Sequence, residues 1–101
     1  MQPVPTVISG TFEWDAAKAI ANEQKHGITF DEAALALASD PYEQTFEDPT
    51  DPAHAISLAM SSRDRVLFVV TTERAERTRI ISARKATPHE QRAYHEAAPD
   101  A

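Results

Sequence analysis

"RVLFVVTTERAERTRIISAR", residues 65–84, predicts the centre of the fold. Residues 65–72 are apolar on both faces, which is typical of a central strand. Residues 73–77 are polar and read as a turn, and residues 78–84 read as a further strand. A turn this short predicts that the two strands are antiparallel neighbours.

Two further strands precede this hairpin. Residues 54–60, "HAISLAM", place Ile56, Leu58 and Met60 on one face. Residues 42–47 alternate loosely and read as an edge strand, separated from the next strand by a polar turn with two prolines. The four strands predict one antiparallel sheet.

Three helices are predicted around the sheet, because each segment has its own start or stop signal. Two precede it, residues 16–26 and 30–39, and one follows it and ends near residue 97. The signals are Asp15 as N-cap and Gly27 as C-terminal residue, Thr29 with Glu32 as a capping box, and Thr87 with Pro88 and Glu90. The predicted class is therefore α+β, with the helices on one face of the sheet and the other face free.

With 101 residues, the chain is expected to form a single domain, residues 12–98, after a flexible tail, residues 1–11. It contains no cysteine, so neither disulfides nor a cysteine metal site are expected. No basic-then-apolar leader and no apolar run of about 20 residues is present, so we expect a cytoplasmic protein without membrane contact.

The net charge of −6 is unevenly distributed along the chain. Residues 1–59 hold two basic and ten acidic residues, whereas residues 60–101 hold eight basic and six acidic ones. The overall field does not steer the protein to nucleic acid. A local anion site in the second half and an acidic surface for a basic partner both remain open.

Four arginines flank or occupy the last predicted strand: Arg74, Arg77, Arg79 and Arg84. A guanidinium group is a planar fork that binds phosphate bidentately and stays charged at any working pH. Two to four of these groups are expected to converge near one end of the last two strands. The alternative is that they form ordinary ion pairs, for which the candidate partners are Glu43, Glu47, Glu73 and Glu76.

Lys25 and His26 lie in the last turn of the first predicted helix, where positive charge suits the helix dipole. They also suit a phosphate site, and His26 suits general acid–base chemistry. No histidine pair has metal-ligand spacing, so no metal is expected. With only Gly10 and Gly27, no glycine-rich phosphate loop is possible, and no cofactor is expected. Trp14 is either a core anchor or, if exposed, a surface that stacks a base.

Taken together, these segments resemble the BrnT family of type II toxins. The resemblance rests on "FEWD" at 12–15, "KHGITFDEA" at 25–33 and "RIISARKAT" at 79–87, in this order and spacing, and covers residues 12–96. It implies a RelE-like fold and an endoribonuclease that cleaves RNA without a metal and inhibits translation. The implied partner is a BrnA-like antitoxin with a ribbon-helix-helix domain, through which alone the toxin contacts DNA.

Carried over by position, the resemblance implies roles for particular residues. Arg79, Arg84 and Arg74 would hold the phosphate, His26 or Glu73 would accept the 2′-OH proton, and Lys25 would protonate the leaving oxygen. Lys18, Arg77 and Trp14 would bind RNA. Two other hypotheses remain: a catalytically degenerate module that acts only by binding the antitoxin, and a structural subunit in which every arginine is ion-paired.

Overall fold

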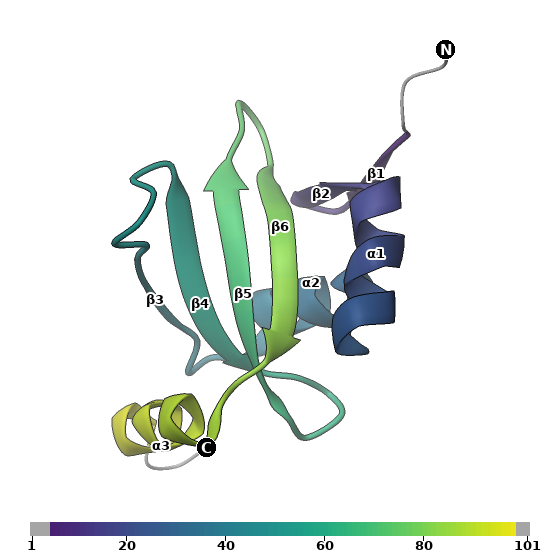
Figure 1. Cartoon of the computed structure of the whole chain (residues 1–101). Helices are drawn as coiled ribbons and strands as arrows, with labels where there is room; N and C mark the ends of the chain where they lie inside the picture. Colours follow the sequence, from purple (N-terminus) through teal and green to yellow (C-terminus); the bar gives the residue numbers. More distant parts are fainter. Residues whose placement is uncertain (1–4, 99–101) are drawn as a thin grey trace.

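The computed structural model describes residues 5–98 as a six-stranded mixed sheet with three helices (Figure 1). The strands lie in the order β1-β2-β6-β5-β4-β3, and all neighbours are antiparallel except β2 and β6, which are parallel. The elements are β1 (Thr6–Ser9), β2 (Phe12–Asp15), α1 (Ala16–His26), α2 (Phe30–Ser39), β3 (Gln44–Glu47), β4 (His54–Met60), β5 (Val66–Glu73), β6 (Thr78–Lys85) and α3 (Pro88–Ala97).

The predicted α+β class is confirmed, and so is the antiparallel run of β3 to β6. The prediction of a four-stranded, wholly antiparallel sheet is wrong, since residues 6–9 and 12–15 add β1 and β2. Residues 12–15 seemed only to lead into the first helix, but they pair in parallel with Thr78 and Arg79. Gly10, with φ of +60°, lies in the turn between β1 and β2.

Residues 5–11 of the predicted tail include β1, and residues 1–4 lie outside the part that the structure describes. A domain spanning 12–98 stays a prediction. Within residues 5–98, no helix has both the length and the apolar composition that crossing a bilayer requires.

The predicted helix caps are confirmed, with one difference. Asp15 and Thr29 accept from backbone N–H groups of the first turns, and Gly27 closes α1 with φ of +71°. Thr87 and Glu90 form the complete capping box of α3. At α2, however, Glu32 turns away from the cap and binds Arg65, with Nη2–Oε1 at 2.7 Å, so only half of that box forms.

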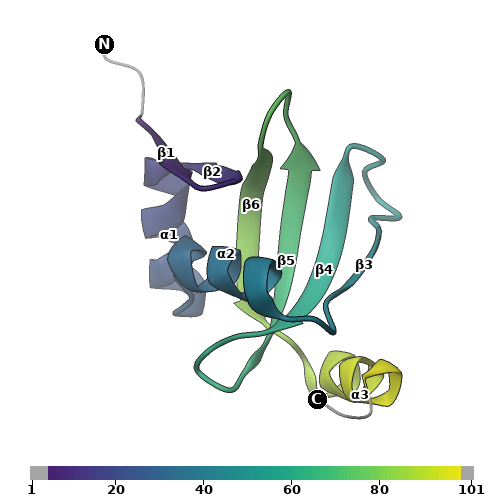
Figure 2. The same ribbon diagram turned by 180° about the vertical axis from the view of Figure 1, so that it is seen from behind.

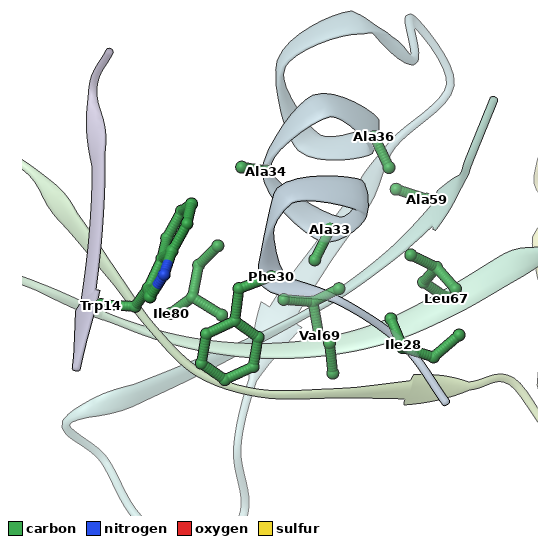
Figure 3. Close-up of a cluster of buried hydrophobic side chains, with 11 residues drawn as sticks. Trp14, Ile28, Phe30, Ala33, Ala34, Ala36, Ala59, Leu67, Val69 and Ile80 are labelled. Atoms are coloured by element: carbon green, nitrogen blue, oxygen red, sulfur yellow. The ribbon is translucent and has the colours of Figure 1, made fainter. Parts of the chain in front are cut away.

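The main core lies between the sheet and the two N-terminal helices (Figures 2 and 3). Trp14 of β2 meets Phe30 of α2 edge-on, with ring centroids 6.0 Å apart. Around them pack Ile28, Ala33, Ala34, Ala36, Ala59, Leu67, Val69, Ile80 and Ala83.

The expectation that all helices share one face is wrong. α3 lies at the end of the sheet where β4 ends and β5 begins (Figure 1), and its Tyr94 is buried against Leu58, Val66 and Ala86. Tyr94 donates its hydroxyl to Asp40 at 2.6 Å, which ties α3 to the end of α2. One surface of the sheet lies opposite α1 and α2, and α3 leaves part of it uncovered. We call this uncovered part the open face.

Candidate functional site

The position of α1 beside β6 is set by one buried side chain. β2 pairs only with the first two residues of β6, which leaves the rest of that strand edge without a neighbouring strand. Asn22 of α1 fills this gap: its amide donates to the carbonyl of Ala83 at 2.8 Å and accepts from the N–H of Ala83 at 3.1 Å. Its second N–H reaches the carbonyl of Ile28 at 3.0 Å. The side chain thus imitates a strand and fixes the helix against β6.

A pocket of about 230 Å³, hereafter the α1–β6 pocket, opens next to Asn22. Lys18, Lys25 and His26 line it from α1, with Ser82 across from them on β6. No acidic residue lines the pocket, and among residues 5–98 none of these three basic side chains has a carboxylate within ion-pair distance. A local excess of exposed positive charge beside a hydroxyl is suited to binding a phosphate group.

Arg79 lies on the open face near the start of β6 and is paired with Glu13 of β2. Glu13 Oε2 accepts from Nε at 3.0 Å and lies 2.8 Å from Nη2. The side chains are 20% and 15% exposed, so the pair is half-buried. A guanidinium has five N–H donors, and this pair uses two. Glu13 therefore holds the guanidinium of Arg79 on the open face.

Arg84 lies at the other end of β6 and is held by α3. Its two terminal nitrogens donate to the two carboxylate oxygens of Glu90 at 2.8 and 3.0 Å, and its guanidinium carbon lies 3.8 Å above the centre of the Phe68 ring. The hydrogen bonds from Arg84 hold the pKa of Glu90 below its usual value. Arg79 and Arg84 are five positions apart, a span on the order of 15 Å along a strand.

Of the predicted convergence of two to four guanidinium groups, the version with all four is therefore wrong. Arg79 and Arg84 lie at opposite ends of β6, each with its own carboxylate. Arg74 and Arg77 lie in the turn between β5 and β6, close in sequence only to Arg79. Arg74 is exposed, while Nε of Arg77 is buried without a hydrogen-bond partner among the described residues.

Two other predicted residues have clear positions. Glu73 ends β5 and accepts a hydrogen bond from the hydroxyl of Thr78 at 3.0 Å, away from the α1–β6 pocket. Trp14 is only 3% exposed, because it belongs to the core beside Phe30. The interpretation of Trp14 as a core anchor is confirmed, and burial contradicts its predicted RNA contact.

Sequence reasoning missed Glu13 and His54, which share a row across the open face. The row follows the register Glu13–Arg79–Thr72–His54. Nδ1 of His54 lies 3.8 Å from Asp48, and Nε2 lies 3.5 Å from Asp51. Alternation with the buried Trp14 was a signal for an outward-facing Glu13, whereas nothing local in the sequence placed His54 opposite Thr72.

Metal-binding geometry is lacking in the part of the chain that the structure describes. Within residues 5–98, no three His, Cys, Asp or Glu side chains lie together as a metal would need.

The family model for the ribonuclease toxin BrnT of type II toxin–antitoxin systems matches residues 14–90. The structure is similar to the crystal structure of the Brucella abortus ribonuclease toxin BrnT, with a TM-score of 0.59 and 22% sequence identity over 73% of this chain and 92% of that one. No curated protein sequence matches the chain significantly.

Proposed function

Since the chain belongs to the BrnT family of ribonuclease toxins of type II toxin–antitoxin systems, we propose that it is an endoribonuclease that cleaves RNA by attack of a ribose 2′-OH. In this proposal the reaction needs no metal ion, and its consequence is inhibition of translation in the cytoplasm. The observation that carries the proposal is the α1–β6 pocket, where Lys18, Lys25 and His26 have no carboxylate of residues 5–98 within ion-pair distance.

The scissile phosphate would lie in this pocket. The ammonium groups of Lys18 and Lys25 and the hydroxyl of Ser82 supply donors for its non-bridging oxygens, where negative charge grows in the transition state. Such preorganised donors stabilise the transition state more than the ground state.

Proton transfer would use the two residues at the end of α1. His26 accepts the proton of the 2′-OH as the new bond to phosphorus forms, and Lys25 donates a proton to the 5′ oxygen as the old bond breaks. The products are a 2′,3′-cyclic phosphate and a free 5′-hydroxyl. Shared lining of one pocket favours His26 over Glu73 as the base, because Glu73 lies elsewhere and already accepts from Thr78.

The arginines would bind the neighbouring phosphates of the strand. Arg79 is partly engaged by Glu13, and Arg84 is partly engaged by Glu90 and the carbonyl of Lys85. Arg74 and Arg77 would extend the track beyond the β5–β6 turn. Because the net charge is −6, RNA would be held by these local cations and not by the overall field.

The partner is an antitoxin, as the family description implies. We propose that it is BrnA-like, with a ribbon-helix-helix domain that makes all contacts with DNA.

The test is cleavage of a labelled RNA by the purified chain in the presence of EDTA. Lys25→Ala and His26→Ala are expected to lower the cleavage rate about 100-fold or more, the usual effect of losing a general acid or base. Arg92→Ala is the charge-matched control, because Arg92 is an exposed cation of α3 that lies outside the pocket. The cleaved RNA is analysed for the expected 2′,3′-cyclic phosphate and 5′-hydroxyl ends.

Equal cleavage by all variants would place the site elsewhere. Cleavage that stops with EDTA would contradict the metal-free reaction. No cleavage at any concentration, with the antitoxin still bound, would support the binding-only alternative.

A further inference from the structure

β3 forms one outer edge of the sheet, and its hydrogen bonds to β4 show which of its backbone groups point away from the sheet. The N–H of Asp48 donates to the carbonyl of His54 at 3.4 Å, in register with the β3–β4 pairs. In an antiparallel ladder, bonded and non-bonded pairs alternate. Phe46 and Gln44 therefore direct their backbone groups to β4, while the N–H and C=O of Thr45 and Glu47 point outward. Such an edge can accept another strand.

The surroundings of this edge are acidic. No lysine or arginine occurs between Lys25 and Arg63. Around β3, the carboxylates are those of Glu43, Glu47, Asp48 and Asp51. Two copies of β3 pairing with each other would bring these like charges together, and RNA would be repelled for the same reason.

An apolar contact point accompanies the edge. Phe46 is 46% exposed and lines a hollow of about 570 Å³, together with Pro52, Ala53 and Ala55. Glu47 and Glu73 also line the hollow. A strand added beside β3 would thus find backbone partners, an aromatic surface and negative charge in one place.

We propose that the free edge of β3 binds an extended, positively charged segment of the antitoxin as a seventh strand, with an apolar side chain beside Phe46. The inference rests on the proposed function only in taking the partner to be an antitoxin. Main-chain hydrogen bonds would supply affinity in this mode of recognition, and the alternating side chains would supply specificity. β3 is separated from β6 by β5 and β4, so this surface is distinct from the α1–β6 pocket.

The structure offers a matched pair of proline substitutions as a test. Thr45→Pro removes an outward N–H and obstructs strand addition at β3; it loses the side-chain hydrogen bond to Ser57 but no backbone bond to β4. Ile8→Pro does the same at the other edge, where the N–H of Ala16 donates to Pro5 and the alternation leaves the N–H of Ile8 outward. The probe is the polypeptide encoded by the adjacent gene, whose affinity for each variant is measured by calorimetry.

Thr45→Pro is expected to weaken binding at least tenfold and Ile8→Pro less than twofold. Circular dichroism checks that both variants fold. Glu47→Lys, which leaves the backbone unchanged, is expected to weaken binding at least fivefold. In the unaltered chain, hydrogen exchange is expected to slow at the amides of Thr45 and Glu47 when the probe binds.

Equal weakening by the two prolines, absent protection at Thr45 and Glu47, or no binding of the probe would overturn the proposal. RNA cleavage by Thr45→Pro is measured as well. A variant that loses binding of the probe but still cleaves RNA shows that the docking surface and the ribonuclease site are separate. A chain that binds through β3 but cleaves no RNA supports the docking surface and contradicts the enzyme.

Discussion

The side-chain amide of Asn22 bonds to both the N–H and the C=O of Ala83, so one helical residue completes the edge of β6. This contact joins residues 61 positions apart. It also aligns α1 along the strand, which brings Lys18, Lys25 and His26 beside Ser82. The pocket therefore depends on a residue that itself carries no charge.

Asn22→Ala is expected to lower the free energy of unfolding by about 2–3 kcal/mol, since it leaves three buried backbone groups without partners. Urea denaturation measures the change. Gln24→Ala, at an exposed position of the same helix, is expected to change stability by less than about 0.5 kcal/mol. Similar values for both variants would show that Asn22 does not hold α1 in place.

Acid is expected to destabilise the fold through carboxylates with lowered pKa values. Hydrogen bonds from Arg84 lower the pKa of Glu90, and hydrogen bonds from Arg65 lower that of Glu32. For Asp40, burial raises the pKa, but hydrogen bonds from Met60, Tyr94 and Tyr42 bring it below the usual value.

Because these pKa values are lower in the folded state, the unfolded chain binds more protons in acid. The stabilisation is complete above the ordinary glutamate pKa of 4.5 and is lost as pH falls through the lowered values. Urea denaturation between pH 7 and pH 3 measures this loss. Glu90→Gln is expected to give a shallower dependence on pH; an identical slope would exclude Glu90 as a contributor.

Glu13→Gln is expected to increase RNA affinity, because it removes the negative charge beside Arg79 and retains a hydrogen-bond acceptor. We expect an increase of about fivefold at low salt, equivalent to roughly 1 kcal/mol. Fluorescence anisotropy with a labelled RNA measures the affinity. Glu23→Gln removes the same charge from an exposed position of α1 outside the pocket lining. An equal gain in both variants would mean that only the net charge matters.

Gly27→Ala is expected to destabilise the protein by about 1 kcal/mol, because φ of +71° is unfavourable for a residue with a Cβ atom. No atom lies within 4 Å of the added Cβ, so the cost is one of backbone conformation. Gly27→Asn is expected to cost less, since asparagine tolerates the left-handed region. Thermal unfolding of both variants checks the order.

Local signals in the sequence explain the successful predictions. The strand at 54–60 was predicted with the observed limits, as were the ends of α1 and α2, because caps and alternation act within a few residues. The pairing of β2 with β6 was not predicted, because it joins segments more than 60 residues apart and no turn links them. The irregular register between β5 and β6 near Val70 and Thr71 was likewise not predicted.

The ion pairs likewise divide into a part that was predicted from the sequence and a part that depends on non-local pairing. The alternative that Arg79 and Arg84 pair with carboxylates is confirmed, but the candidate partners were wrong. Glu13 lies beside Arg79 only because of the unpredicted parallel strand, and Glu90 meets Arg84 only because α3 packs at the end of the sheet. The sequence identified which residues carry charge, whereas the non-local topology determines which charges meet.

The parallel pairing of β2 with β6 also orders events during synthesis. As the chain leaves the ribosome, Glu13 and Trp14 emerge more than 60 residues before the strand beside which they will lie. Neither the edge that Asn22 completes nor the pocket beside it exists until β6 is made. The α1–β6 pocket therefore forms only after the chain has been translated through β6.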